Sequence, residues 1–476
     1  MKNLVNIVSA GMFSSCLLMP SICRAQPAKT QRPNILFLFA DDMRSSTIHA
    51  LGNDEIITPN LDRLARSGTS YVNNYIMGGT SGAVSMPSRA MLMTGRYLFS
   101  IDREGEEIPE EQTTMGEAFR NAGYETYGIG KWHNGKQSFN RTFADGGNIF
   151  FGGMTDHWNV PVYDYDPTDK YVAQIPYTVS FETQKVAYRD GDNINAGKHS
   201  SEMFSDRAID YINHYDGKSP FFMYVAYTAP HDPRVMPQKY LDMYDTAKIA
   251  LPPNFIYKHP FDNGELQIRD EKLLGFPRNK AEVKNEIRRY YAMITQLDEQ
   301  IGRVIAALKA KGLYENTIIV FAADNGLALG QHGLLGKQNV YEHSVKVPLI
   351  FAGKGFEAGK KEERFTYLQD IFPTLCEVAK IPVPASVESQ SVFSTNKREV
   401  MFYAYRNLQR AVRKDNFKWI EYHVNGVETV QLFDLKNDPW EINNLANDPK
   451  YSKQIEAMKK LLREQEKIYN DPYLKL

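Results

Sequence analysis

Polar side chains that could bind a metal ion or an anion follow four of the apolar runs in this sequence. Asp41-Asp42 follows the first run and Asp324-Asn325 a later one, with Lys131-Trp132-His133 and Pro230-His231-Asp232 between them. Ligands of open α/β sheets bind outside the carboxyl ends of the strands. Carboxylate and amide oxygens suit Ca²⁺, and less well Mg²⁺, whereas Zn²⁺ prefers His and Cys. Each pair alone is more typical of a turn or a helix cap than of a metal site, so it is their occurrence together that indicates a site.

Residues 81–97, SGAVSMPSRAMLMTGRY, add a possible anion site. Ser85-Met86-Pro87-Ser88-Arg89 is expected to open a helix, with its proline in the first turn. A helix N-terminus presents free N–H groups and positive potential to an anion, and Arg89 can point back to the same spot. On these residues alone, a plain helix start capped by Ser85 is the better explanation of the segment.

These residues need a scaffold of buried strands joined by helices. Apolar runs of strand length predict buried strands, and amphipathic runs predict helices. The expected strands are residues 34–40, 127–130, 221–227, 317–323 and 347–351, and the expected helices are residues 58–67, 113–122, 200–215 and 281–311. This alternation predicts an α/β fold with a large, mostly parallel central sheet and helices on both faces.

The remainder of the chain divides into loops and a smaller C-terminal part. Residues 142–198, rich in Gly, Asp and Tyr, are expected to form long loops around a substrate. A composition shift at residues 382–394 predicts a boundary, and short strands at 399–405, 418–423 and 429–434 precede a charged helix from about Lys453. We therefore expect a catalytic domain over residues 26–390 and an antiparallel α+β subdomain over residues 391–476.

The first 25 residues have the pattern of a signal peptide. Lys2 precedes an apolar stretch over residues 4–19, and Cys23-Arg24-Ala25 places small residues at the positions that a signal peptidase recognises before its cleavage site. A buried N-terminal helix is the alternative, which the extreme N-terminal, acid-free run disfavours. A lipoprotein anchor at Cys16 or Cys23 has less support, because Ile22 is bulky and Cys16 lies inside the apolar run. We expect a periplasmic or secreted protein.

The composition excludes several other classes. The 476 residues are 42% hydrophobic, with 56 basic and 57 acidic side chains, which is typical of a globular protein rather than a disordered or fibrous one. The leader carries Lys2 and Arg24 and no acids, so its removal leaves 54 basic against 57 acidic residues, a balance of −3. This charge argues against a nucleic-acid binder, and no other run reaches the roughly 18 apolar residues of a membrane span. Only Cys376 would remain, which excludes a disulfide scaffold.

Taken together, the motifs resemble those of the type I formylglycine-dependent sulfatases, in the alkaline-phosphatase-like superfamily. Residues 85–96 are similar to the signature [Cys or Ser]-x-Pro-Ser-Arg followed by Thr-Gly-Arg. Further matches occur along the chain, in the same order as in the family, at residues 33–42, 130–133, 230–231, 324–326, 333–337, 347–348 and 433–445. The resemblance covers nearly the whole mature chain and implies the α/β fold of that superfamily and a bacterial carbohydrate sulfatase.

The resemblance also assigns a nucleophile and a metal site. Ser85 would be converted to formylglycine (3-oxoalanine), whose hydrated aldehyde is the family's nucleophile. The residues that resemble the ligands of a divalent cation, usually Ca²⁺, are Asp41, Asp42, Asp324 and Asn325, with an oxygen of residue 85 added. Serine in place of the commoner cysteine resembles the subtype that an oxygen-independent radical maturation enzyme modifies in bacteria.

Five further residues gain roles by the same resemblance. Arg89 would orient the modified residue, and Lys131 and Lys337 resemble the lysines that grip the sulfate. His133 resembles the base that acts on the hydrated aldehyde, and His231 the residue that faces the leaving oxygen. The physical logic agrees, because cations cancel the repulsion between an anionic ester and an anionic nucleophile, and a histidine can protonate an alcohol leaving group.

The expected function is release of inorganic sulfate from a sulfated carbohydrate, such as a glycosaminoglycan, mucin-type or algal glycan fragment. A phosphomonoester, phosphodiester or phosphonate hydrolase is an alternative, although Lys131, His133 and Lys337 together favour sulfate. A catalytically silent glycan-binding relative is another, and the complete residue set argues against it. Six other residues could line a sugar pocket or be ordinary loop surface: His157, Trp158, His199, Arg234, Arg406 and Arg410. For the last two, pairing with acids of the C-terminal sheet is a strong alternative.

Overall fold

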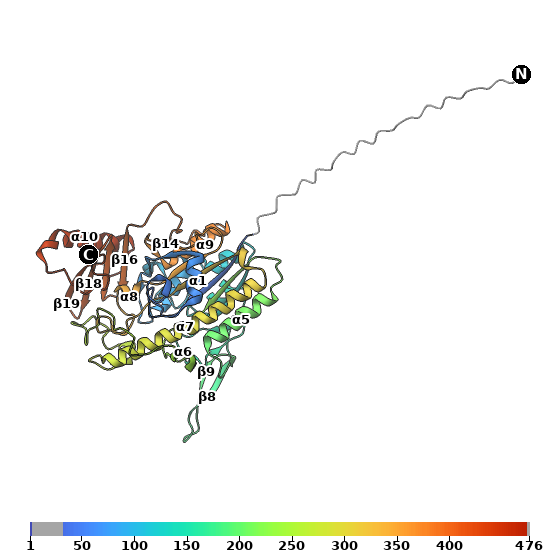
Figure 1. Ribbon diagram of the computed structural model, residues 1–476, viewed down its shortest axis with the longest axis horizontal. Helices are drawn as coiled ribbons and strands as arrows, with labels where there is room; N and C mark the ends of the chain where they lie inside the picture. The colour runs from blue at the N-terminus through green and yellow to red at the C-terminus, as the bar shows by residue number, and fades with distance from the viewer. Residues whose placement is uncertain (2–31, 474–476) are drawn as a thin grey trace. The chain divides into compact units, whose positions relative to one another are not determined.

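The computed structural model describes residues 1 and 32–473, so the expected leader lies outside the described residues except for Met1. An eight-stranded sheet forms the centre of the protein (Figure 1). In spatial order its strands are β14 (Lys360–Glu362), β2 (Gly68–Tyr71), β13 (Leu349–Ala352), β12 (Thr317–Ala323), β1 (Asn34–Ala40), β11 (Phe221–Ala226), β5 (Glu125–Lys131) and β6 (Asp145–Phe150). The five from β12 to β6 are parallel to one another, which confirms the predicted mostly parallel sheet.

The register of the central strands places the candidate residues at one edge. Ala40, the last residue of β1, pairs with Ala323, the last residue of β12, and Ala226 of β11 pairs with Gly130 of β5. Because β1 and β11 are also parallel neighbours, the carboxyl ends of all four strands meet. All seven residues of β1 and of β12 are buried, as expected of strands covered on both faces.

Helices cover both faces of the sheet. The helices are α1 (Pro59–Ser67), α2 (Ser85–Thr94), α3 (Met115–Asn121), α4 (Lys136–Thr142), α5 (Ser200–His214), α6 (Gln238–Leu241), α7 (Lys280–Ala310), α8 (Glu342–Val345), α9 (Ile371–Ala379) and α10 (Ser452–Ile468). Adjacent residues of β6, Gly146 and Gly147, face Phe139 of α4 and Arg207 of α5 respectively. Since successive strand residues point to opposite faces, α4 and α5 lie on opposite sides of the sheet, as predicted.

A second, antiparallel sheet contains the C-terminal strands. Its order is β19 (Val427–Asp434), β18 (Phe417–Val424), β17 (Gln409–Lys414), β16 (Val400–Tyr405) and β4 (Gly78–Gly79), and α10 packs against it. The predicted C-terminal strands and helix are therefore present. The domain boundary at residue 390 stays a prediction.

The structure differs from the sequence-based expectations, or adds to them, in three places. Residues 142–198 are not only loops: they contain β6, the short strands β7 (Pro161–Val162) and β10 (Asn193–Ile194), and a hairpin of β8 (Gln174–Ser180) and β9 (Lys185–Asp190) that extends away from the sheet (Figure 1). β13 is antiparallel to β12. β17 was missed because its sequence, QRAVRK, is too charged for a buried strand, yet Arg410 and Arg413 are buried in ion pairs with Asp471 and Glu342.

Strand β4 ties the second sheet to the segment that precedes Ser85. Gly78 pairs with Ala404 of β16, and a Cβ at Gly78 would lie 2.0 Å from the Ala404 carbonyl oxygen. Its φ of +103° is also a conformation that side chains rarely adopt. Only glycine therefore allows this approach, which sets the start of the loop leading to α2.

Gly78→Ala is expected to lower the free energy of unfolding by more than about 3 kcal/mol, because backbone strain and overlap add. Gly52→Ala is the matched control: its φ is +113° but no atom lies within 4 Å of the added Cβ. We expect the control to cost only about 1–2 kcal/mol. Urea unfolding of both variants measures the difference, and equal losses would contradict a role for the close approach.

Among the described residues, no helix is long and apolar enough to cross a membrane.

Candidate active site

Ser85 lies at the centre of the residues predicted from the sequence. It begins α2, as expected, and its side chain is buried. Its Oγ lies 3.3 Å from Asp41 Oδ1, 3.2 Å from Asn325 Oδ1 and 3.5 Å from Lys337 Nζ. Its hydroxyl does not cap the helix, so the capped-start interpretation is wrong. The serine instead faces the strand ends.

Three carboxylates and three cations surround this hydroxyl in pairs. Lys131 Nζ lies 2.7 Å from Asp41 Oδ2, and Lys337 Nζ lies 2.6 Å from Asp42 Oδ1. The third pair joins Arg89 to Asp324, with Nε and Nη2 at 3.0 and 2.9 Å from Oδ2. All six side chains are buried. Their formal charges cancel, so a bound divalent cation would leave a surplus of positive charge for an anionic ester.

The pKa values of the carboxylates reflect this crowding. Burial and the neighbouring Asp324 raise the pKa of Asp41 to about 6. Burial opposes ionisation of Asp324 as well, but Arg89 and Lys131 hold its pKa far below the ordinary value. Lys337 and His231 likewise overcome burial and lower the pKa of Asp42. The site thus keeps negative charge in the protein interior, where it needs compensation by cations.

Arg89 connects the helix to two strand ends. Besides Asp324, it donates from Nη1 to the Lys131 carbonyl oxygen at 2.9 Å, and its guanidinium lies 5.0 Å from the centre of the Phe39 ring. Its Nη2, paired with Asp324, also lies 4.0 Å from Asp41 Oδ1. The side chain is therefore fixed between the ends of β5 and β12.

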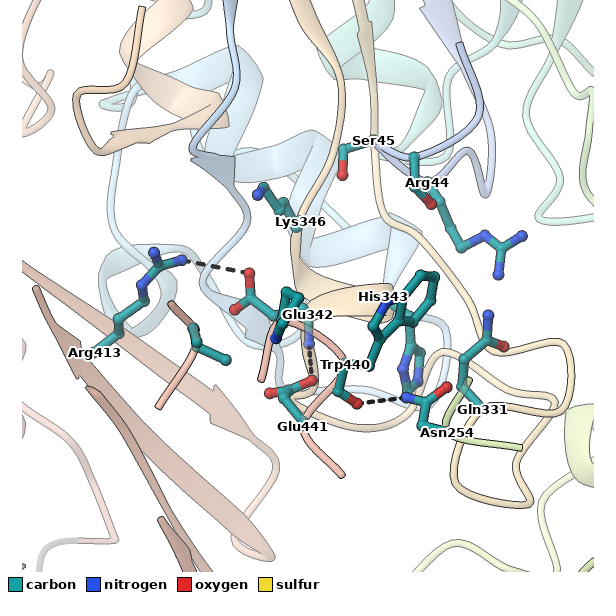
Figure 2. Close-up of a pocket in the computed structure, with 13 residues that line it drawn as sticks. Arg44, Ser45, Asn254, Gln331, Glu342, His343, Lys346, Arg413, Trp440 and Glu441 are labelled. Carbon is teal, nitrogen blue, oxygen red and sulfur yellow. Dashed lines mark hydrogen bonds and ion pairs between the residues drawn. The ribbon is translucent and has the colours of Figure 1, made fainter. Parts of the chain in front are cut away.

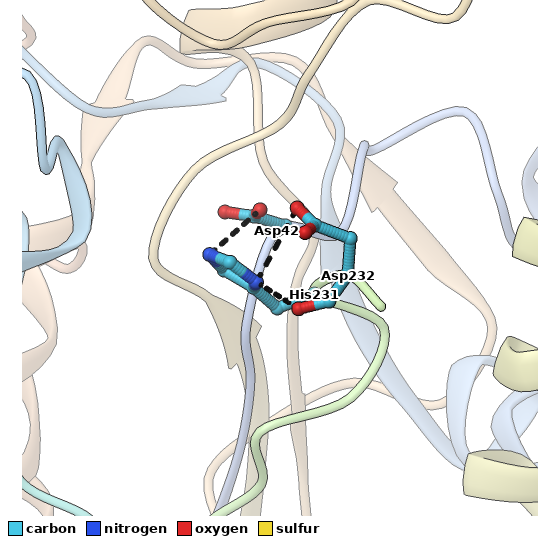
Figure 3. Close-up of side chains that lie close together, drawn as sticks. All are labelled: Asp42, His231 and Asp232. Atoms are coloured by element: carbon cyan, nitrogen blue, oxygen red, sulfur yellow. Dashed lines mark hydrogen bonds and ion pairs between the residues drawn. The ribbon is translucent and has the colours of Figure 1, made fainter. Parts of the chain in front are cut away.

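His231 approaches the same cluster from the β11 end (Figure 3). Its Nε2 lies 3.6 Å from Asp42 Oδ2, and its Nδ1 lies 2.7 Å from the Asp232 carbonyl oxygen. The Asp232 carboxylate is bound on both oxygens by Arg269, and this partner and His231 hold its pKa well below the ordinary value despite burial. Sequence reasoning missed Arg269, since it stands in a segment with no motif of its own.

His133 lies beside the cluster without bonding to it. Burial and the nearby Lys131 and Arg89 lower its pKa well below the ordinary value, so the ring is neutral. Its Nδ1 has no hydrogen-bond partner among the described residues, and it lines a cavity of about 1410 Å³ together with Met86. Both His133 and Asp42 have left-handed backbones, with φ of 74° and 61°, a strain that often marks functional sites.

The predicted metal ligands fit a hard divalent cation. Oxygen atoms of Asp41, Asp42 and Asp324 lie within 4.8 Å of one another, and the Asn325 amide oxygen reaches the same hydroxyl as Asp41. Such oxygen donors suit Ca²⁺ or Mg²⁺. A second group, Asp42 with His231 and Asp232, is less suitable because Arg269 already occupies both Asp232 oxygens.

The candidate sugar-pocket residues mostly have partners inside the protein. His157 and His199 are buried and stacked on each other, and burial lowers their pKa values to about 3 and about 4. Arg234 pairs with Glu286. Arg410 pairs with Asp471 and Arg406 with Glu265, so pairing explains both, although Glu265 lies outside the C-terminal sheet. Trp158, in contact with His199, is half-buried.

A parallel α/β sheet with a buried hydroxyl, three carboxylates and three cations at its carboxyl edge defines an enzyme that hydrolyses anionic esters. Residues 33–381 match the family model described as Sulfatase, and residues 330–468 match that of the N-sulphoglucosamine sulphohydrolase C-terminal region. The chain belongs to the sulfatase family and is a sulfuric ester hydrolase.

Individual relatives agree with this assignment. The chain is 25% identical over 536 residues to an N-acetylglucosamine-6-O-sulfatase of Bacteroides thetaiotaomicron, covering 96% of this chain and 90% of the relative. It is 30% identical over 475 residues to a sulfatase of Formosa agariphila, covering 92% and 89%. A solved structure in complex with its substrate D-glucosamine-2-N,6-O-disulfate has the same fold, with a TM-score of 0.76, 23% identity and coverage of 94% and 100%.

Proposed function

We propose that this sulfatase is exported and removes sulfate from a sulfated carbohydrate, with residue 85 as the nucleophile. The observation that carries the proposal is the position of Ser85 Oγ, within 3.5 Å of Asp41, Asn325 and Lys337 at the start of a helix. The relatives named as sulfatases of N-acetylglucosamine and ulvan support a sugar substrate. The leader over residues 1–25 supports periplasmic or secreted location, with a surface lipoprotein less favoured.

A radical maturation enzyme would convert Ser85 to formylglycine. The hydrated formylglycine would supply one hydroxyl that attacks sulfur and a second that permits release of the sulfate. Ca²⁺ held by Asp41, Asp42, Asp324 and Asn325 would supply positive charge beside the sulfate. Because the charges of the six paired side chains sum to zero, a bound Ca²⁺ would make the site net positive toward an anionic ester.

The chain's own residues perform the remaining tasks. Lys131 and Lys337, which here contact the carboxylates, can turn to the sulfate oxygens once a cation neutralises those carboxylates. Arg89 holds the start of α2 against β12. His231 can donate its Nε2 proton to the leaving sugar oxygen, and neutral His133 can accept a proton from residue 85.

A panel of sulfate esters tests the substrate class. Calcium-loaded, matured protein should release inorganic sulfate from N-acetylglucosamine 6-sulfate or another sulfated sugar at least about 100-fold faster than it releases phosphate from the matching sugar phosphate, a difference of about 2.7 kcal/mol in the barrier. Faster phosphate release would favour the phosphoester alternative. Sugar binding without any turnover of a matured residue 85 would favour the silent relative.

His231→Ala is expected to separate substrates by their leaving groups. A sugar alcohol needs a proton as it leaves, so its release should slow by about 10²–10⁴-fold. A 4-nitrophenyl leaving group needs no proton, so hydrolysis of its sulfate ester should slow by less than about tenfold. Steady-state rates on both esters give the comparison, and equal losses would show that His231 does not act on the leaving oxygen.

A further inference from the structure

A second cavity lies apart from Ser85, between the loop after β1 and the segment that follows β19. Its volume is about 260 Å³. Figure 2 shows Arg44, Ser45 and Lys346 across from Glu441 and Trp440. None of the residues assigned to catalysis or metal binding lines this cavity.

Arg44 carries a buried positive charge with no acceptor. The residue is only 5% exposed, and among the described residues its guanidinium forms no hydrogen bond or ion pair. The guanidinium lies over the Tyr290 ring, whose centre is 5.2 Å from Cζ. Because buried arginines almost always have hydrogen-bonded partners, this guanidinium has the properties of an anion ligand.

Two further nitrogen donors line the same cavity without partners. Lys346 Nζ lines the cavity, has no ion pair or hydrogen bond within residues 32–473, and lies 5.9 Å from the centre of the Tyr75 ring. His343 Nε2 is buried and also lacks a partner in this part of the chain. Nitrogen donors from two segments, Arg44 in the loop after β1 and His343 and Lys346 at α8, thus line one cavity.

The two acids of the cavity form their ion pairs with other cations. Glu342 lies 3.0 Å from Lys418 and 3.4 Å from Arg413, and Glu441 lies 2.9 Å from Lys418. Glu441 also accepts the Glu342 backbone N–H at 2.8 Å, and burial raises its pKa to about 7. Their charges are matched, so Arg44 and Lys346 leave the cavity with a positive surplus.

We propose that this cavity is a second sulfate-binding site, with Arg44, Lys346 and His343 as donors. Sulfate is the oxyanion that a sulfuric ester hydrolase releases and that its substrates carry, and its size suits a cavity of this volume. Trp440, 39% exposed and held by a 2.7 Å bond from Asn254 Nδ2 to its carbonyl oxygen, offers a stacking face for a sugar. The ligand is therefore either free sulfate or a sulfated sugar residue.

The site shares backbone with the metal-binding segments. Gly326 follows Asn325 and donates its N–H to the Ser344 carbonyl oxygen at 2.9 Å, and a Cβ on Gly326 would meet both Arg44 and the His343 carbonyl oxygen. Gly326 therefore packs between the metal-ligand segment and the residues that line the second cavity.

Equilibrium dialysis of radiolabelled inorganic sulfate against the calcium-loaded full chain tests the proposal by stoichiometry. Wild type should bind two sulfates, Lys346→Gln one and Lys337→Ala one, and the double variant none. Lys346→Gln should keep sulfatase activity within about twofold, since Lys346 touches no catalytic residue. Two sulfates on Lys346→Gln, or a single sulfate on wild type that Lys337→Ala removes, would overturn the proposal.

A second measurement does not depend on the variants folding. Crystals of wild type soaked in selenate should show an anomalous peak between the Arg44 guanidinium and Lys346 Nζ, and absence of that peak would overturn the proposal. Trp440→Ala then distinguishes the two sources in a Ser85→Ala background. A loss of at least fivefold in affinity for N-acetylglucosamine 6-sulfate at this site, with inorganic sulfate unchanged, identifies a sugar ligand. Unchanged affinity for both identifies free sulfate.

Discussion

Ser85→Ala should abolish sulfate release from a sugar sulfate while binding of that sugar sulfate changes by less than about tenfold. Loss of a nucleophile lowers kcat by about 10⁴-fold or more, because no other group in the site can form the covalent intermediate. Binding should persist because, in the proposed mechanism, Lys131, Lys337 and a bound cation would contact the sulfate independently of residue 85. Sulfate release measures the first effect, and calorimetry measures the second.

Ser81→Ala is the matched control for this prediction. Ser81 precedes the same helix and is buried, but its hydroxyl bonds only the Ala83 backbone N–H, at 3.3 Å. The control should retain activity within about threefold. Loss of one neutral hydrogen bond lowers stability by about 1 kcal/mol, and the change removes no contact with a proposed catalytic residue. If Ser85→Ala released sulfate faster than buffer without enzyme, residue 85 would not be the nucleophile.

Asp324→Asn should damage both activity and stability, because Asp324 is a proposed ligand of the cation and the ion-pair partner of Arg89. The change removes one carboxylate ligand and leaves the buried guanidinium with Asp41 as its nearest acid, at 4.0 Å. Breaking a buried ion pair costs about 3–5 kcal/mol. We expect that loss in the free energy of unfolding and a fall of at least about 10³-fold in kcat/KM, equivalent to about 4 kcal/mol.

Removal of calcium should likewise lower both activity and stability. Wild type stripped with a chelator should lose activity and unfold at a lower temperature, and calcium should restore both, because a ligand that binds the native state stabilises it. Asp324→Asn should show a much smaller thermal response to calcium. Asp206→Asn is the control, since its pairs with Arg303 and Lys198 are partly exposed and should contribute less than about 1 kcal/mol. An equal calcium response in wild type and Asp324→Asn would contradict the assignment.

Strand ends were the part of the site that the sequence could predict. Apolar runs locate β1, β11 and β12 to within a residue, and parallel pairing then brings Asp41 and Asp324 to one edge. The partner of Asp232 could not be predicted in this way. Arg269 is distant in sequence and lies in an irregular segment, so no periodicity relates it to His231. Contacts of this kind depend on tertiary packing alone.

Charged and exposed strands were the part of the fold that local patterns missed. β17 carries arginines that look solvent-exposed, but ion pairs such as Arg410 with Asp471 allow their burial. The β8–β9 hairpin exposes aromatic and branched residues, including Phe181 and Tyr188, so alternation of polar and apolar residues gives no signal there. In both cases burial does not follow hydrophobicity, because charged residues of β17 are buried and apolar residues of the hairpin are exposed. Prediction of strands from hydrophobic periodicity assumes that the apolar residues are the buried ones.

Mass spectrometry of the peptide that contains Ser85, taken from protein purified from its native host, determines whether residue 85 is converted to formylglycine. Conversion to formylglycine removes two hydrogens from serine, and the same preparation should release inorganic sulfate from a sulfated sugar. We predict that the modified peptide is present and that its fraction rises in proportion to activity across preparations. Full sulfatase activity in protein whose residue 85 is entirely unmodified serine would contradict the account.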